Sequence, residues 1–119
     1  MTGTMDTAIE TFYDHIIGDV LGHISGITSK RMFGGYGIYR DGVIFAIITG
    51  DGELRFKADD TTKDKYEARG GEQFTYTGHT SRPPTPMPYW RVPDEVLEDR
   101  ELITSWVEEA VMISKLRKR

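Results

Sequence analysis

The residues best suited to bind an anion in this sequence are the glycines of Gly34-Gly35-Tyr36-Gly37. Glycines let backbone amides approach a phosphate, but a phosphate loop runs from a strand into a helix N-terminus and commonly ends in Lys-Ser or Lys-Thr. Here another strand-like run follows the glycines, which favours a bent strand entry or a β-bulge instead. We expect no nucleotide site and no cofactor.

Metal ligands and nucleophiles are few. No pair among His15, His23 and His79 has the four-residue helical spacing that brings two imidazoles to one ion. The chain has no cysteine, which excludes disulfides, thiolate metal sites and cysteine nucleophiles. Its serines and threonines lack a glycine-x-serine-x-glycine elbow, and most carboxylates lie where helix caps or solvated faces account for them. We therefore expect no metal site and no enzymatic activity.

Aromatic and basic residues are interleaved along the predicted strands, a pattern with which proteins stack and hold single-stranded nucleic acid. The net charge of −4 opposes a general attraction to nucleic acid, and a small domain needs most of its aromatic residues for a core. Nucleic-acid binding, helped by the basic run Lys115 to Arg119, is therefore an alternative. The residues of the pattern are Tyr36, Tyr39, Phe74, Tyr76, Tyr89 and Trp90, with Arg40, Arg55, Lys57 and Arg91.

The stretch that must position these groups is Arg31 to Lys57, which holds three strand-like runs separated by two glycine turns. Asp41-Gly42 favours a tight hairpin turn, and Gly50-Asp51-Gly52 a second turn, so the runs predict an antiparallel meander. The middle run, Val43 to Ile48, is apolar without alternation and predicts the central strand, covered on both faces. In the third run alternation predicts Leu54, Phe56 and Ala58 in the core and Glu53, Arg55 and Lys57 in water.

Helices are predicted at both ends of the chain. Apolar residues at three- and four-residue intervals predict a first helix from Thr7 to about Leu21. Thr7 and Glu10 have capping-box spacing, and Thr4 is the other candidate cap. Asp99 is expected to cap the last helix, whose apolar stripe consists of Leu102, Ile103, Trp106, Val107, Ala110 and Ile113.

Shorter elements are predicted between the third run and the last helix. Asp59 or Asp60 caps a short helix over Thr61 to Arg69, which Tyr66 anchors and Gly70-Gly71 ends. A fourth strand at Gln73 to Thr77 and a loop at Gly78 to Pro86 follow. The fifth strand, Met87 to Val92, contains Pro88, which cannot donate a ladder hydrogen bond and places this strand at an edge or beside a bulge.

The predicted order is helix, three strands, short helix, two strands, long helix. It indicates one α+β domain over residues 1–119, with an antiparallel sheet of about five strands and helices packed on one face. No apolar stretch approaches membrane-spanning length, and the N-terminus lacks the features of a secretory signal. We expect a soluble, cytoplasmic protein that does not contact membranes.

Several runs of this sequence are together typical of one protein family. They are Arg31-Met32-Phe33-Gly34-Gly35-Tyr36-Gly37-Ile38-Tyr39-Arg40-Asp41-Gly42, Phe45-Ala46, Leu54-x-Phe56-Lys57-x-Asp59-Asp60, Phe74-x-Tyr76, Tyr89-Trp90-x-Val92-Pro93, and Trp106 with Ala110. Through them nearly the whole chain resembles the N-terminal domain of the TfoX/Sxy family of bacterial competence regulators. The resemblance implies an α+β domain without an established catalytic site or cofactor. It also implies that longer members, which add a helical domain, act through the cyclic-AMP receptor protein.

These observations predict a domain that works by contact with a protein, in transcriptional regulation. The candidate interaction surface is the edge around the glycine hairpin, because exposed aromatic residues and arginines are typical interface anchors. A homodimer formed through the predicted edge strand is possible, and a small-molecule site or an enzyme beneath the loop Gly78 to Pro86 is a further alternative. The candidate surface consists of Arg31, Tyr36, Tyr39, Arg40 and Lys57.

Overall fold

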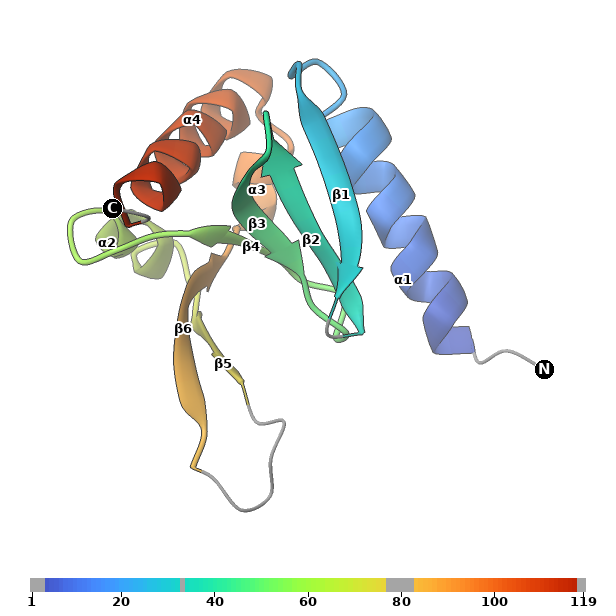
Figure 1. The fold of residues 1–119 in the computed structure, drawn as a ribbon, viewed down its shortest axis with the longest axis horizontal. Helices are drawn as coiled ribbons and strands as arrows, with labels where there is room; N and C mark the ends of the chain where they lie inside the picture. The colour runs from blue at the N-terminus through green and yellow to red at the C-terminus, as the bar shows by residue number, and fades with distance from the viewer. Residues whose placement is uncertain (1–3, 33, 77–82, 118–119) are drawn as a thin grey trace.

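The computed structural model describes residues 4–32, 34–76 and 83–117 (Figure 1). It confirms the predicted α+β fold, with one antiparallel sheet in the order β1-β2-β3-β4-β6-β5. In chain order the elements are α1 (Thr4–His15), the π-helical segment η1 (Ile16–Val20), β1 (Ile27–Met32), β2 (Gly35–Arg40), β3 (Val43–Ile48), β4 (Leu54–Lys57), α2 (Lys63–Glu67), β5 (Gln73–Tyr76), β6 (Thr85–Arg91), α3 (Asp94–Leu97) and α4 (Arg100–Arg117).

The predicted meander forms the middle of the sheet. Strands β2, β3 and β4 pair antiparallel in sequence order, and β3 is a central strand as predicted. Asp41 and Gly42 connect β2 to β3 with φ of 50° and 83°, the left-handed conformations that a tight hairpin turn requires. The second turn, after β3, closes through the amide of Gly52, which donates to the carbonyl of Thr49 at 2.9 Å.

The sheet has six strands, because β1 precedes the predicted meander and pairs with β2 from Ile27 to Met32. Most of its side chains are exposed or half-buried, since β1 lies at the edge of the sheet. An edge strand needs few apolar residues, and the run between Ile27 and Met32 is polar. Its sequence therefore lacks the hydrophobic pattern that reveals a buried strand.

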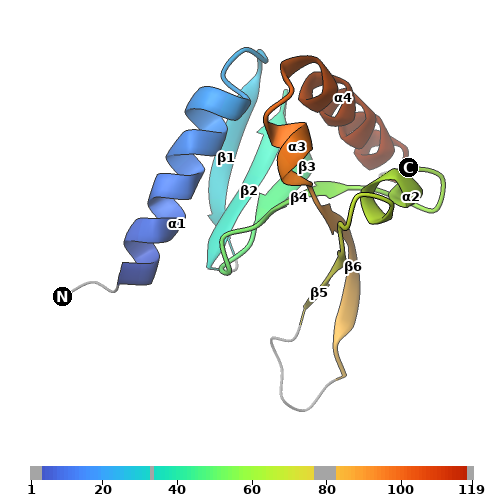
Figure 2. The same cartoon turned by 180° about the vertical axis from the view of Figure 1, so that it is seen from behind.

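All four α-helices lie against one face of the sheet, as predicted. Figure 2 shows α1 and α3 in front of the strands, whereas Figure 1 views the molecule from the opposite side. Helix α4 contacts β3 and β4 on the same face, and Trp106 of α4 packs on Tyr66 of α2. The core lies between these two layers. Its largest fully buried side chains are Tyr66, Phe45, Phe56, Ile16, Leu21, Ile38, Ile48, Leu54 and Ile103.

The first helix begins earlier than predicted. It starts at Thr4, so Thr7 lies inside the helix and the capping-box interpretation of Thr7 with Glu10 is wrong. Apolar periodicity indicates only those helical turns that pack on the core. It therefore could not predict the first turn of α1, which precedes the regularly spaced apolar residues. The helical backbone continues through η1 to Val20, which agrees with the predicted end near Leu21.

Strand β6 is an interior strand that pairs with both β4 and β5, so the prediction of an edge strand is wrong. The alternative of a bulge beside Pro88 is right, because the β5–β6 register shifts between Gln73 and Thr75. On the other side of β6, the carbonyl of Pro88 accepts a bond of 3.1 Å from the amide of Ala58. Proline has a backbone carbonyl that can accept a hydrogen bond but no N–H to donate one. It therefore fits at the register shift, where β5 offers no acceptor for an N–H at this position.

The connecting elements largely agree with those predicted from the sequence. Asp59 precedes α2 and accepts a bond of 2.9 Å from the amide of Thr61, while Asp99 caps α4 by accepting one of 3.0 Å from Leu102. Residues 77–82 of the predicted loop, with His79, lie outside the described residues, as do the last two residues of the basic run. Among the helices of the described ranges, none has the length and apolar character that crossing a membrane requires.

Candidate functional site

The strand register sorts the side chains of the sheet onto two faces, because partners directly opposite each other project the same way. Ile38, Ala46 and Phe56 are aligned across β2, β3 and β4 and project toward the helices. Gly37 is aligned with Ile47, Ile47 with Arg55, and Arg55 with Arg91. These alternate positions belong to the other face, which no described helix covers and which we call the open face.

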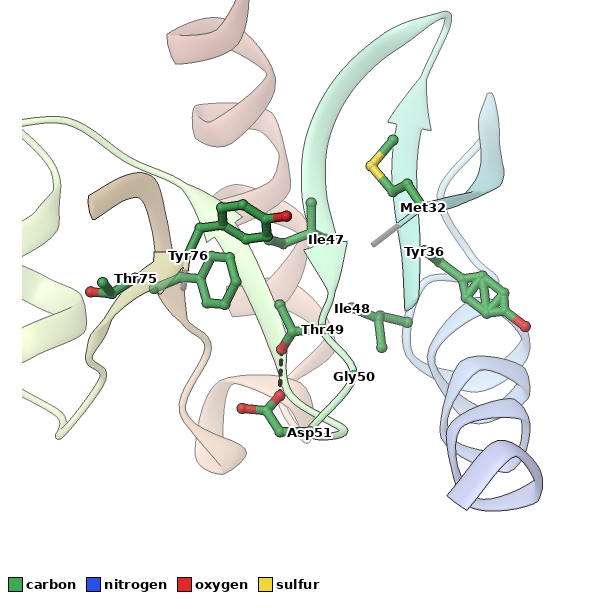
Figure 3. A pocket seen from close by; sticks show the side chains of 10 residues that line it. Met32, Tyr36, Ile47, Ile48, Thr49, Gly50, Asp51, Thr75 and Tyr76 are labelled. Atoms are coloured by element: carbon green, nitrogen blue, oxygen red, sulfur yellow. Dashed lines mark hydrogen bonds between the residues drawn. The ribbon is translucent and has the colours of Figure 1, made fainter. Parts of the chain in front are cut away.

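The open face contains an apolar hollow of about 280 Å³. A second space of about 280 Å³ adjoins it at the β3–β4 turn, where the polar residues Thr49, Asp51 and Thr75 form part of the lining. Figure 3 shows Tyr76 of β5 beside Ile47 of β3, with Met32 of β1 across from them. The floor comes from β3 and the walls from the end of β1 and the β5–β6 hairpin. The residues that line the hollow away from the turn are Met32, Ile44, Ile47, Phe74, Tyr76, Met87 and Tyr89. We call these seven residues the open-face hollow.

Two glycines of β2 allow this packing. A Cβ atom on Gly37 would lie 2.7 Å from Cε of Met32, so the missing side chain leaves room for Met32 over the sheet. A Cβ atom on Gly35 would lie 1.8 Å from the carbonyl oxygen of Ile48, so the two backbones approach too closely for any other residue. The glycine cluster therefore serves strand packing, and it leads into β2 as the sequence predicted.

A buried arginine closes the hollow near the β3–β4 turn. Arg55 is only 8% exposed, so the prediction that it faces water is wrong. Its Nε donates to the hydroxyl of Thr49 at 3.2 Å, its Nη2 donates to Asp51 at 3.0 Å, and its guanidinium lies 5.0 Å from the ring centre of Phe74. Strand alternation located Arg55 on the correct face, but it could not predict that the β5–β6 hairpin covers it.

Asp51 is held as a carboxylate. Partial burial raises the pKa of Asp51, but the hydrogen bond from the Thr49 hydroxyl and the charge of Arg55 outweigh this effect and lower the pKa below its ordinary value. The dashed line in Figure 3 marks the bond between Thr49 and Asp51. The negative charge of Asp51 is thus used to balance the buried guanidinium.

Cations lie over aromatic rings across the rest of the open face. The Nζ of Lys30 lies 5.7 Å from the ring centre of Tyr39, and the Nζ of Lys57 lies 5.3 Å from that of Tyr89. Burial, with a smaller contribution from Tyr39, raises the pKa of the Tyr89 phenol, so this ring stays neutral. Attraction to the ring quadrupole holds each cation without neutralising its charge.

Charge is divided unevenly between the strands and the rest of the chain. The six strands contain six basic residues and no acidic residue, although the whole chain carries a net charge of −4. By the register, four of the basic residues belong to the open face and two to the helix face. The four are Lys30, Arg55, Lys57 and Arg91, and the two are Arg31 and Arg40.

The five residues of the predicted interaction surface do not form one surface. Tyr39 and Lys57 lie on the open face, next to Tyr89. Tyr36 is 7% exposed and stacks on Tyr13 of α1, with ring centres 4.0 Å apart, so it belongs to the core. The Nη1 of Arg31 donates to the Tyr36 hydroxyl at 3.3 Å on the helix face, and Arg40 lies opposite Val43 at the end of β2.

Sequence reasoning missed the apolar members of the hollow, such as Ile44, Ile47 and Met87. Part of the signal was recognised, because the run Val43 to Ile48 is apolar at both alternating positions and predicted a strand covered on both faces. An apolar residue directed away from the helices, such as Ile47, indicates a second apolar surface. Met87 could not have been assigned to this surface, because the irregular register of β5 and β6 determines which way its side chain points.

His15 and His23 make separate contacts in the structure. His15 bonds to Asp19 at 3.1 Å on the first helical segment, and His23 bonds to Thr104 of α4 at 2.6 Å. Among the residues that the structure describes, no group of three or more histidine, aspartate or glutamate side chains is placed to share a metal ion.

Comparison with known proteins adds one finding to this geometry. A family model described as the TfoX N-terminal domain matches residues 19–113, nearly the whole chain. No curated protein matches the chain. The match includes every strand of the sheet and therefore all seven residues of the open-face hollow.

Proposed function

The chain belongs to the TfoX N-terminal domain family, and from this premise we propose that it is a non-enzymatic regulatory domain that binds a partner protein. The open-face hollow is the contact surface in this proposal. The observation that carries it is an apolar, aromatic sheet face that the described helices leave uncovered, with Lys30, Lys57 and Arg91 elsewhere on the same face. The resemblance to the TfoX/Sxy regulators extends the proposal to competence-type transcriptional regulation in the bacterial cytoplasm.

The lining of the hollow favours the side chains of a protein over a small molecule. Pockets for small molecules combine an apolar lining with a few convergent polar groups that orient the ligand. The open-face hollow measures about 280 Å³ and is lined by seven apolar or aromatic side chains. A space of this kind accepts one or two large apolar side chains, which are the anchors that dominate protein interfaces.

The state of Asp51 supports a role without catalysis. A general base works best when its pKa lies near the operating pH. The Thr49 hydroxyl and the Arg55 guanidinium instead lower the pKa of Asp51, which stabilises the carboxylate and makes it a weak base. This carboxylate balances a buried cation and shapes the end of the hollow.

Single-stranded nucleic acid is the second candidate, because the strands hold basic residues and no acidic ones. Such a module requires ring faces that are open to bases. The rings of Tyr39, Phe74 and Tyr89 already have a cation within 5.7 Å, and Tyr89 is only 6% exposed. These features make a base platform the weaker of the two candidates.

The proposal is tested by affinity capture from the source cell with matched variants. Ile44→Glu adds a charge to the half-buried rim of the hollow, and Met112→Glu adds one to a residue of α4 that is 62% exposed. Circular dichroism checks that both fold, and Tyr76→Ala replaces Ile44→Glu if the latter does not. We expect wild type and Met112→Glu to capture the same proteins and the hollow variant to lose them. Equal capture by the hollow variant would contradict the proposal.

A further inference from the structure

We propose that the partner segment bound by the open-face hollow is an acidic, apolar peptide, with large apolar side chains flanked by aspartate or glutamate. This inference rests on the proposed function, because it takes the open face as a protein contact surface. It goes further by specifying the chemistry of the partner. Three properties of the face support it: the lining of the hollow, the distribution of charge, and the poor fit of the other candidates.

The lining of the hollow favours a large apolar side chain of the partner as the anchor. Ile47 and Tyr89 are nearly buried at its base, with exposed fractions of 7% and 6%. Met32 and Met87 are half-buried in its walls. Methionine side chains are unbranched and polarisable, so they adapt to apolar groups of different shapes. A leucine, phenylalanine or tryptophan of the partner fits this lining, whereas a polar side chain would lose its hydrogen bonds to water there.

The positive charge around the hollow favours acidic residues on both sides of the partner's apolar anchor. Lys30, Lys57 and Arg91 belong to the open face beyond the Arg55–Asp51 ion pair, and no strand contributes a carboxylate to it. Arg91 lies 4.0 Å from Glu53, which follows the β3–β4 turn. The acidic residues that give the chain its net charge of −4 lie in the helices and loops. Because exposed charges are screened over about 8 Å at physiological ionic strength, the nearby cations determine which peptide is attracted.

A second copy of this chain fits the same face poorly. Two copies paired face to face would use the same patch on both subunits, as a two-fold interface does. That arrangement would bring Lys30 and Lys57 of one copy toward the same cations of the other. Like charges across an interface oppose association, so an acidic segment is the better complement.

Nucleic acid also fits less well than an acidic peptide. The cations would attract phosphate, but sequence-tolerant binding of single strands depends on stacking of the bases. The lining of the hollow is a row of aliphatic, thioether and ring groups, which offers base edges few hydrogen bonds. The partner's apolar groups must enter a concave space, and an aliphatic or aromatic side chain does this better than a base that carries polar edges.

The experiment is a fluorescence-anisotropy titration of the full chain with four labelled probes of matched length. The first peptide has leucine, phenylalanine and tryptophan flanked by aspartate and glutamate. The second has the same apolar residues flanked by lysine, the third has serine in place of the apolar residues, and the fourth is oligothymidine. We expect saturable binding of the first probe, at least about tenfold tighter than that of the others, and weaker binding as salt is added.

Two variants locate the binding. Lys30→Glu reverses a charge on the open face, and Lys115→Glu makes the same change at an exposed position of α4. We expect the first to weaken the acidic apolar peptide about tenfold and the second to leave it unchanged. Equal binding of the lysine-flanked peptide, tighter binding of oligothymidine, or no binding of any peptide would overturn the inference. A dimer in solution that Ile44→Glu dissociates would overturn it too.

Failure of this inference is distinguishable from failure of the proposed function. If the acidic peptide does not bind but Ile44→Glu still abolishes capture of partners from the cell, the open face is a contact surface for another chemistry. If Ile44→Glu captures the same partners as wild type, the proposed function itself fails.

Discussion

Arg55 is a buried cation that connects two parts of the open face. A buried guanidinium is costly unless hydrogen bonds and an opposite charge compensate for its desolvation. Thr49 and Asp51 supply these, and the ring of Phe74 covers the outer side of the group. The arginine thus joins the β3–β4 turn to the β5–β6 hairpin and fixes one wall of the hollow.

The first prediction concerns Asp51→Asn. In the folded protein the pKa of Asp51 is lowered from 3.8, so the stability that the carboxylate contributes is present above that value and lost as the pH falls through the folded-state pKa. We expect the variant to lower the free energy of unfolding by about 1 kcal/mol at neutral pH, because the Asp51 side chain is 58% exposed and solvent screens its charge. Urea unfolding at neutral and at acidic pH measures this.

The difference between wild type and Asp51→Asn should shrink at acidic pH, where the wild-type carboxyl is protonated as well. Glu108→Gln on the exposed face of α4 is the control and should change little at either pH. A difference that stays constant from neutral to acidic pH would show that the charge of Asp51 does not stabilise the fold.

The second prediction concerns Tyr66, which is fully buried against Trp106 with ring centres 4.6 Å apart. Burial, and secondarily the charge of Glu109, raises the pKa of its phenol, so the group stays neutral. The hydroxyl has no hydrogen-bond partner among the described residues. Tyr66→Phe should therefore keep the free energy of unfolding within about 1 kcal/mol of wild type, whereas Tyr66→Ala should lower it by about 3–5 kcal/mol.

Chemical denaturation of the two Tyr66 variants separates the roles of the ring and the hydroxyl. If Tyr66→Phe were as damaging as Tyr66→Ala, the hydroxyl would have to make a bond that the described contacts do not include. A stable Tyr66→Phe would show that packing of the ring alone anchors α2.

At the scale of the elements, Gly35 lets the start of β2 lie close to the backbone of β3. The third prediction compares two alanine substitutions next to each other. Gly35→Ala brings a Cβ atom to 1.8 Å from the Ile48 carbonyl, so the strands must separate, and we expect a loss of about 3 kcal/mol or more. Gly34→Ala meets no atom within 4 Å, and its cost of about 1–2 kcal/mol comes from its φ of +76°.

Thermal and urea unfolding measure both glycine variants. The contrast is informative because the two residues are neighbours and the substitution is identical. Equal losses for Gly34→Ala and Gly35→Ala would contradict the close approach between β2 and Ile48.

The sequence predicted the elements that carry a strong local signal. Asp41-Gly42 specifies its turn through backbone conformation, and Asp99 specifies the start of α4 through its side-chain oxygen. Strand β1 was missed because an edge strand needs few apolar residues, and the interior position of β6 was missed because Pro88 indicated an edge. The second error concerns pairing between the distant segments β4 and β6, which local patterns do not encode.

The candidate site was predicted less well than the fold, for the same reason. Tyr39 and Lys57 lie half-buried on the open face. Strand alternation predicted the outward direction of Lys57, because alternation is a local property. The exclusion of Tyr36 from that surface depends on its stacking with Tyr13 of a distant helix. The hollow depends on the position of the β5–β6 hairpin, which brings Phe74 over Arg55 through a register shift.

On the scale of the whole molecule, the sheet separates two environments. Helices cover one face and form the core there, and the other face combines an apolar hollow with basic side chains. The acidic residues lie outside the strands, so a chain of net charge −4 presents a locally cationic face. Apolar groups beside basic side chains, on a face that the described helices leave uncovered, are typical of an interaction site.

The central claim is that the open face binds a partner, and it is tested most directly by nuclear magnetic resonance. The labelled acidic, apolar peptide is titrated into isotopically labelled protein, and the shifts of the backbone amides are followed. We predict that the shifts concentrate at Met32, Ile44, Ile47, Phe74 and Met87, with α1 and α4 little affected. Shifts concentrated on α1 and α4, or no shifts at saturating peptide, would contradict it.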